Sequence, residues 1–311
     1  MAFRLLRCEL YKLKRTPFVG LVALAACLFP VPAALLALNG GTDGSFLSLS
    51  FLLLVMLAGP LLLPVVGGCL AVLLFHRERD WETLKNLYTV PVRWSGLVAA
   101  KLFVVYLGCI LFAVISLLAA AATIAATGTP VTSLFTSLAA AGLLGFFYAS
   151  ATLPVILLVL WLDRGTLVSI LLCVLYGVAQ STQLFGGVYV IAGTGSAEAA
   201  SLASPLLWTF PMLVFRWYTS FAASGQVVLP PDTAPFYLST PPLVGLCLVL
   251  IVVCGAAIVW LATCARLSPV IRACSSNPSA TCLAIRSMLR RISTVNSTSG
   301  AWSRIYSCGL V

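Results

Sequence analysis

Long apolar runs alternate along the chain with short polar or charged stretches. A transmembrane helix needs about 20 consecutive apolar residues, and several runs reach that length. We therefore predict six membrane-spanning helices, at about 18–38, 46–75, 97–126, 134–162, 166–191 and 243–265. Tight breaks such as Asp163-Arg164-Gly165 separate neighbouring runs. The pattern predicts an all-α, polytopic membrane protein.

Two of the predicted spans carry packing or bending features. As one continuous helix, the second span would be roughly 45 Å long, against a hydrocarbon core of roughly 30 Å. We expect it to tilt or break, and the candidate break points are Gly59-Pro60, Pro64 and Gly67-Gly68. In the fourth span, Ala141 and Gly145 have the spacing of small residues that lets two helices approach closely.

Composition agrees with the pattern. Of the 311 residues, 61% are hydrophobic and only 8% are charged, and the mean hydropathy is +1.09. No soluble fold can bury that much apolar surface, so the bilayer must be the main solvent. The net charge of +10 does not indicate nucleic acid as a partner, because the basic residues cluster at the ends of apolar runs.

The positions of Lys and Arg predict the orientation. Suppose that the N-terminus lies in the cytoplasm and the chain crosses six times. The cytoplasmic side then holds five basic residues before the first span, five between spans 2 and 3, Arg164, and six after the last span, which is 17 of the 18. Only Arg216 lies outside. Such an asymmetry predicts a multi-pass protein of the cell membrane with both termini in the cytoplasm.

A segment at about 193–241 would then lie on the outer side. Its central part, 202–222, is apolar enough for a seventh span, but that would place the tail arginines outside, and Pro205 and Pro211 do not suit a lipid-facing helix. We expect 202–222 to lie flat as an amphipathic surface helix or to dip in as a re-entrant hairpin. Its interface anchors would be Trp208, Phe210, Phe215, Arg216 and Trp217.

The densest charged stretch lies at 77–90, between spans 2 and 3. Its charges alternate in sign, which suits a solvated helix, and Pro91 ends it. One side of this helix is largely apolar and the other polar; the first holds Trp81, Leu84, Leu87 and Tyr88, and the second Glu78, Glu82, Lys85 and Asn86. An amphipathic helix just outside a membrane offers a surface to lipid headgroups or to a soluble partner.

Both ends of the chain differ from the spans. Residues 3–15 predict an interfacial amphipathic helix with a basic face, suited to an anionic cytoplasmic leaflet. Residues 267–311 contain ten serines and no Asp or Glu. That composition predicts a basic, disordered cytoplasmic tail, and it also resembles the product of a frameshift that replaces a native C-terminus.

The sequence carries no catalytic or metal-binding pattern. No P-loop is present, His76 is the only histidine, and the eleven cysteines form no Cys-x-x-Cys pair. The cysteines within apolar runs are expected to pack as small apolar side chains. No Asp or Glu lies in the middle of a span. We therefore expect no enzyme activity and no bound cofactor or metal, so energy for any transport must come from a partner.

Two motifs carry a family resemblance. One is Glu9-Leu10-Tyr11-Lys12-Leu13-Lys14-Arg15-Thr16-Pro17, directly before span 1, and the other is Glu78 followed by Thr83-Leu84-Lys85-Asn86-Leu87, Pro91-Val92 and Ala100-Lys101. With these motifs, residues 1 to about 266 resemble an ABC-2-type transporter permease, of the bacteriocin and lantibiotic protection type. The chain departs from the family where Trp81-Glu82 replaces the usual Gly before Thr-Leu, and again in the tail after Arg266.

The resemblance implies an elbow helix at 1–17, a six-span domain at 18–266, and a cytoplasmic coupling helix at about 77–90. That helix would seat in a groove of an ATPase subunit, and short outer helices would cap the pathway. Two permease subunits, identical or different, would pair with two ATPases, and ATP would bind to the ATPases. The coupling residues would be Glu78, Trp81, Glu82, Thr83, Leu84, Leu87, Tyr88 and Pro91.

The implied function is export of an amphipathic substrate (a peptide, an antibiotic or a lipid-like molecule) driven by ATP hydrolysis in the separate subunit. Membrane lipid would be a further partner. The alternative is a membrane anchor or sensor that recruits a soluble partner through the same charged helix and moves no substrate. ATPase activity that rises when the two proteins are reconstituted together would favour the transporter.

Overall fold

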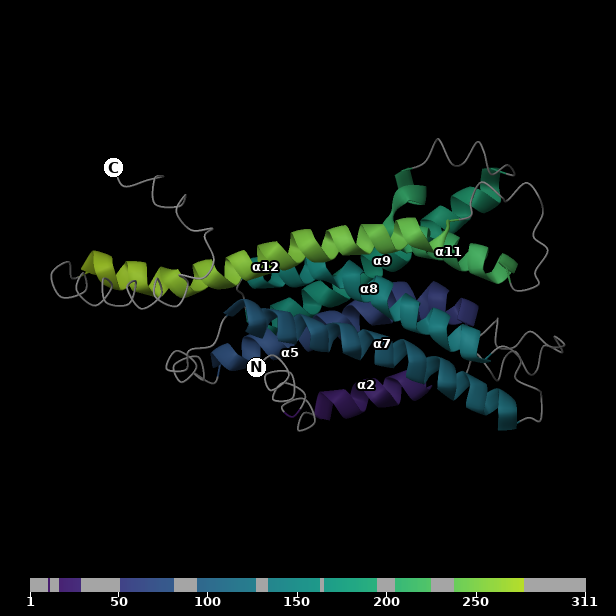
Figure 1. Cartoon of the computed structure of the whole chain (residues 1–311), viewed down its shortest axis with the longest axis horizontal. Coiled ribbons are helices and arrows are strands. Elements are labelled where there is room, and N and C mark those ends of the chain that lie inside the picture. The colour runs from purple at the N-terminus through teal and green to yellow at the C-terminus, as the bar shows by residue number, and fades with distance from the viewer. Residues whose placement is uncertain are drawn as a thin grey trace. The chain divides into compact units, whose positions relative to one another are not determined.

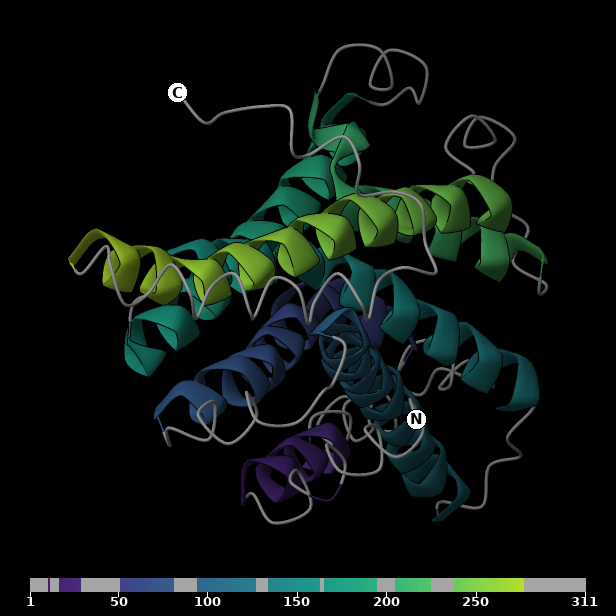
Figure 2. The ribbon, with the colours of Figure 1, turned by 60° about the vertical axis from the view of Figure 1, so that its left-hand side comes forward.

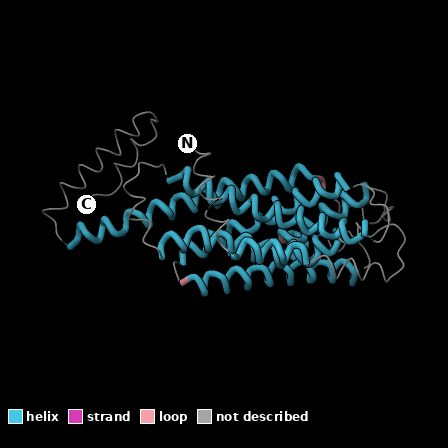
Figure 3. Tube along the Cα trace, turned by 90° about the horizontal axis from the view of Figure 1, so that it is seen from below, coloured by secondary structure: helices cyan, strands magenta, loops and turns pink. Residues whose placement is uncertain are grey.

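The computed structural model describes Tyr11 and residues 17–28, 51–80, 94–126, 134–162, 165–194, 205–224 and 238–276. All regular elements in these ranges are helices, and the described residues contain no strand (Figure 3). In chain order (Figure 1) they are α2 (Pro17–Leu28), the π-helix η1 (Leu54–Leu62), α5 (Leu63–Asp80), α7 (Trp94–Ala126), α8 (Leu134–Leu162), α9 (Thr166–Thr194), the 3₁₀-helix η2 (Pro205–Trp208), α11 (Phe210–Ser224) and α12 (Thr240–Ser276).

Among the described residues, five helices are long and apolar enough to cross a membrane, and they correspond to predicted spans 2 to 6: Phe51–Phe75, Ser95–Thr123, Leu134–Leu162, Thr166–Val190 and Thr240–Leu261. This confirms the all-α, polytopic class. Of the first predicted span, the structure describes only the 12 residues of α2. Residues 29–38 lie outside the described part of the chain, so the first span, and with it the total of six, stays a prediction.

The chain divides into two compact units, Met1–Val259 and Trp260–Val311. In the second unit, the described residues are the last part of α12, which ends at Ser276. Residues 267–276 were predicted to begin a disordered tail, but they are helical. Extending an existing helix needs no new nucleus, so it continues here although the stretch contains Pro269 and three serines. Residues 277–311 lie outside the described part.

Within the first unit, α8 is the most enclosed helix. It packs against α7, α5, α9, α11 and η1, and its aromatic residues Phe147 and Tyr148 are fully buried. Helix α2 packs on α7 at the side of the bundle (Figures 1 and 2). By contrast, α9 and α12 expose large apolar side chains, among them Leu171, Leu175 and Val252. Faces of this kind suit a hydrocarbon solvent.

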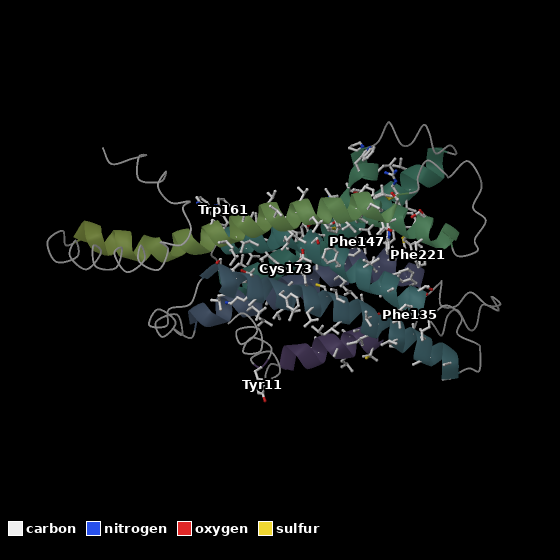
Figure 4. The ribbon with its side chains drawn as sticks, viewed as in Figure 1. Tyr11, Phe135, Phe147, Trp161, Cys173 and Phe221 are labelled. Carbon is white, nitrogen blue, oxygen red and sulfur yellow. The ribbon has the colours of Figure 1, made fainter. Side chains whose placement is uncertain are left out.

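Exposed aromatic side chains mark both ends of α8. Phe135 is 84% exposed and Trp161 is 67% exposed, and they lie toward opposite ends of the helix (Figure 4). Their separation along the helix axis is about 39 Å at 1.5 Å per residue. A bilayer with its interfacial regions is about 40–45 Å thick, and aromatic residues are enriched at its two interfaces. The dimensions of α8 therefore match a membrane span.

The second span bulges where a break was predicted. The π-helix η1 contains Pro60, and the N–H of Leu63, just after it, bonds to the carbonyl of Ala58 five residues back. Proline has no N–H to give to the regular ladder, and the wider turn accommodates it. The chain stays helical from Phe51 to Asp80. Beside the proline, a Cβ on Gly59 would lie 2.6 Å from the ring of Tyr148, so the bulge fits closely against α8.

Glycine also lets α7 and α8 approach closely. A Cβ on Gly145 would lie 2.7 Å from the Cα of Ile110 and 2.9 Å from the carbonyl oxygen of Cys109. Both are backbone atoms, so a larger residue would force the helices apart. The predicted small-residue contact at Gly145 is confirmed. Cys109 and Cys173 are fully buried free thiols and fill space between helices, as predicted for apolar packing.

Candidate functional sites at the two ends of the bundle

One candidate site lies where α5 ends and α7 begins, and we call it the Lys101 end. The apolar span stops at Phe75, but the helix continues to Asp80. Glu78 therefore stands on a helical extension beyond the span, although its side chain lies outside the described part. The other predicted coupling residues also lie outside the described residues: Trp81, Glu82, Thr83, Leu84, Leu87, Tyr88 and Pro91.

Lys101 connects the two helices at this end. Its side chain is buried, with 3% exposed, and its Nζ donates a hydrogen bond of 2.7 Å to the carbonyl oxygen of Leu74. The same Nζ lies 4.8 Å from the centroid of the Phe75 ring, within the range of a cation–π contact. The sequence identified Lys101 only as one of the cytoplasmic basic residues and as part of the family motif. Its position within the apolar stretch VAAKLFVV could have predicted that its side chain is buried with a polar partner.

The opposite end, which we call the Trp217 end, contains η2 and α11. Pro205 is the first residue of η2, and Pro211 is the second residue of α11. A proline in the first turn of a helix costs no hydrogen bond, because that N–H has no partner inside the helix. The prolines therefore start the two short helices. Between them, the hydroxyl of Thr209 donates to the carbonyl of Leu206 at 2.7 Å.

Trp217 anchors α11 inside the bundle. It is 1% exposed, its ring meets Phe147 edge-on at 5.1 Å, and its indole N–H donates to the hydroxyl of Thr240 at 3.2 Å. Phe147 lies about 20 Å along α8 from its first residue, Leu134, at 1.5 Å per residue. The contact between Phe147 and Trp217 is therefore well away from the end of α8. Figure 4 shows Phe147 and Phe221 in this region. The sequence predicted Trp217 as an interface anchor, but its tertiary packing makes it a core residue.

The remaining outer-segment residues divide between core and surface. The ring of Phe210 meets Tyr148, and Phe215 packs on the buried cluster Leu184, Leu207 and Met212. Trp208 stays 65% exposed, with the guanidinium of Arg216 5.5 Å from its ring centroid. Burial lowers the pKa of Arg216 from its ordinary value, and an arginine remains protonated at neutral pH. Whether this segment is re-entrant or lies flat stays a prediction, since a helix lying on the end of the bundle can also bury one face against it.

A set of polar groups missed by sequence reasoning surrounds Pro154 in the middle of the bundle. Pro154 lies inside α8 and cannot donate to the carbonyl four residues back, that of Ser150. Nearby, Tyr106 donates to the hydroxyl of Ser150 at 3.0 Å. Tyr176 donates to the carbonyl of Ala151 at 2.7 Å, and Gln180 donates to Tyr176 at 2.7 Å. Of these bonds, the one from Tyr176 satisfies a backbone carbonyl in the turn before the proline, as polar side chains do around prolines in membranes.

The described residues contain no group of three or more His, Cys, Asp or Glu that could hold a metal ion. What the geometry defines is a multi-pass helical membrane protein, with a helix that continues beyond the apolar span at one end and two short helices packed on the bundle at the other. Residues 5–180, more than half of the chain, match the family model described as ABC-2 family transporter protein. The chain belongs to the ABC-2 family of transporter proteins. No curated protein and no solved structure matches it.

Family membership confirms the resemblance at the level of the ABC-2-type permease. The chain is a multi-pass permease component of an ABC transporter, and its family is one of membrane transport components. Membership in this family implies association with an ABC ATPase subunit. The bacteriocin and lantibiotic subtype stays a prediction.

Proposed function

We propose that this chain is the transmembrane subunit of an ATP-driven exporter and that its ATPase partner docks on residues 77–90. The observation that best supports the proposal is the continuation of the second span as helix from Phe75 to Asp80. A continuous helix joins the span to the charged segment without a flexible break. A movement of that segment by the ATPase would therefore displace the second span along with it.

In this proposal the Lys101 end faces the cytoplasm and the Trp217 end faces outward, as the distribution of basic residues favours. Trp81, Leu84 and Leu87 would insert in a groove of the ATPase, with Thr83, Tyr88 and Pro91 flanking them. Glu78 and Glu82 would meet basic groups at the rim of the groove. Buried aromatic anchors carry much of the free energy at protein interfaces, so Trp81 would contribute the most.

An amphipathic substrate fits the bundle better than a fully polar one. Its interior is mostly apolar, and polar side chains occur around Pro154, where Tyr106, Ser150, Tyr176 and Gln180 are linked by hydrogen bonds to one another or to backbone carbonyls. At the outer end, Trp208 offers an exposed aromatic face. A peptide, an antibiotic or a lipid-like molecule has the matching combination of apolar surface and few polar groups.

We propose that two such permease subunits, identical or different, complete the transporter with two ATPases. Lipid covers the remaining apolar surface. The exposed residues of α9 and α12, among them Leu171, Leu175 and Val252, supply apolar area for either neighbour. ATP would bind to the ATPase subunits alone.

The test is purification of the tagged full-length chain from its native membrane, followed by mass spectrometry and an affinity measurement. We expect an ABC ATPase without membrane spans to co-purify. Leu84→Ala should weaken its binding by roughly tenfold or more, the loss expected for an interface anchor. Leu171→Ala, an exposed apolar truncation in α9, is the matched control. A partner that is not an ATPase would support the anchor or sensor instead, and an ATPase bound equally by both variants would exclude docking at 77–90.

A further inference from the structure

We propose that Lys101 is a positioning residue that ties together the two helices flanking the ATPase-docking segment, so that a movement of this segment displaces spans 2 and 3 as one unit. The inference rests on the proposed function. It concerns a residue of the membrane domain that lies outside the docking segment itself.

The geometry places the tie at the junction. Lys101 lies on α7 about 10 Å from its first residue, Trp94, at 1.5 Å per residue. Its Nζ reaches the carbonyl oxygen of Leu74 at 2.7 Å and the ring of Phe75 at 4.8 Å, and Phe75 is the last residue of the apolar span. In an α-helix the carbonyl of Leu74 also faces the N–H of Glu78, four residues on. The ammonium group therefore holds the turn from which the helical extension leaves the membrane.

A structural role alone would not require a lysine here. Leu97, Val98, Val104 and Val105 on α7 are buried, so apolar contacts already hold the helix in the bundle. Burying an ammonium group costs desolvation free energy. An apolar side chain of similar length at position 101 would pack in the same place without that cost. A lysine at this position is therefore better explained by a directional contact between α5 and α7.

The contact is also suited to transmit a displacement. A charge-assisted hydrogen bond is directional and stronger than a neutral one, and in a low-dielectric site its loss is felt more than in water. When the docking segment moves with its ATPase, α5 and α7 would have to move together as long as the bond persists. Without this bond, α5 and α7 could move independently, and less of the displacement of the docking segment would reach spans 2 and 3.

The experiment uses the full-length permease and its co-purified ATPase in vesicles of phosphatidylethanolamine and phosphatidylglycerol, with Mg-ATP as the probe. Two quantities are measured, the affinity between the subunits and the stimulation of ATP hydrolysis by the permease. For Lys101→Met we expect unchanged affinity and unchanged thermal stability, and stimulation reduced by roughly three- to thirtyfold, the range of coupling changes at indirect sites. Lys101→Arg keeps a cation with hydrogen-bond donors and should restore most of the stimulation.

Thr123→Val is the matched control, because it removes another side-chain hydrogen bond of α7, the one to the carbonyl of Ala120, away from the junction. It should leave the stimulation unchanged. Stimulation by Lys101→Met equal to that of the natural sequence would overturn the inference, and so would a parallel loss of affinity, thermal stability and stimulation, because that reports a structural role. If Lys101→Met does not insert, Lys101→Gln decides between the same outcomes. No ATPase binding by the natural sequence would instead contradict the proposed function.

Discussion

The two ends of the bundle are held together in different ways. At the Trp217 end, α11 is fixed by interlocking aromatic rings: Trp217 packs on Phe147 and Phe221, and Phe51 packs on Tyr218. At the Lys101 end, a directional contact from an ammonium group joins α5 to α7. Close-packed aromatic contacts resist displacement in every direction, whereas a hydrogen bond adds resistance along one line to the apolar contacts of α7. The comparison suggests a firmly packed Trp217 end and a more adjustable Lys101 end.

The largest effect that would break this comparison is a reversed orientation. Ser196→Cys, Gln226→Cys and Ser275→Cys, introduced one at a time into a cysteine-free background, test it with a membrane-impermeant thiol reagent added outside. We expect complete labelling at positions 196 and 226 and none at 275, because the proposed topology keeps α11 on one side of the membrane and returns the chain to the cytoplasm through α12. Labelling of 196 and 226 from opposite sides would establish a seventh span.

The next largest effect concerns the packed end. Trp217→Ala should lower the free energy of unfolding by about 3 kcal/mol or more, because it opens a cavity beside Phe147 and leaves the hydroxyl of Thr240 without its donor. Trp208→Ala, nine residues earlier and 65% exposed, is the matched control and should cost about 1 kcal/mol or less. The measurement is thermal or denaturant unfolding in detergent. Equal costs for the two tryptophans would show that the Trp217 end is not held by burial.

A smaller effect is expected in the middle of the bundle, where Gly145 lets α7 and α8 approach closely. Gly145→Ala should cost roughly 1–3 kcal/mol, because its Cβ would collide with the backbone of Ile110, which cannot move without shifting α7. Gly142→Ala on the same helix has nothing within 4 Å of its Cβ, so it should be neutral or slightly stabilising. Unfolding curves of both variants check this, and a neutral Gly145→Ala would contradict the close approach of α7 and α8.

The smallest effect is expected at Tyr148. Its ring is buried against Gly59, and its hydroxyl has no hydrogen-bond partner among the described residues. Tyr148→Phe keeps the ring and removes the buried hydroxyl, so it should leave stability unchanged or raise it by up to about 1 kcal/mol. The unfolding midpoint in detergent measures this. A loss of stability would reveal a hydrogen bond to a group beyond the described residues.

The sequence predicted the helices of the bundle well, because length and hydropathy determine a transmembrane helix almost alone. The span predicted at 134–162 coincides with α8, and those predicted at 97–126 and 166–191 differ from α7 and α9 by three residues at one end. Proline also gave the position of the irregularity in the second span, but its presence does not distinguish a break from a π-helical bulge.

The sequence predicted tertiary partners poorly. An aromatic residue next to a basic one, such as Trp217 after Arg216, has the same pattern whether it meets lipid headgroups or the interior of a bundle, so the burial of Trp217 against Phe147 was missed. Lys101 was counted as a charge that sets orientation, since hydropathy does not reveal a hydrogen bond to a carbonyl 27 residues earlier. The predicted coupling residues from Trp81 to Pro91 stay a prediction, because they lie outside the described residues.

The central claim is that the Lys101 end receives the action of the ATPase through Trp81. The most direct test is ATPase stimulation by the reconstituted permease with Trp81→Ala, compared with Trp161→Ala. Trp161 is a 67% exposed tryptophan in the last turn of α8, which ends on the same side of the bundle as α7 begins. We predict that Trp81→Ala inserts normally and abolishes most of the stimulation, since truncating an interface anchor costs on the order of 2 kcal/mol or more, whereas Trp161→Ala retains it. Full stimulation by Trp81→Ala, or equal losses in both variants, would contradict the account.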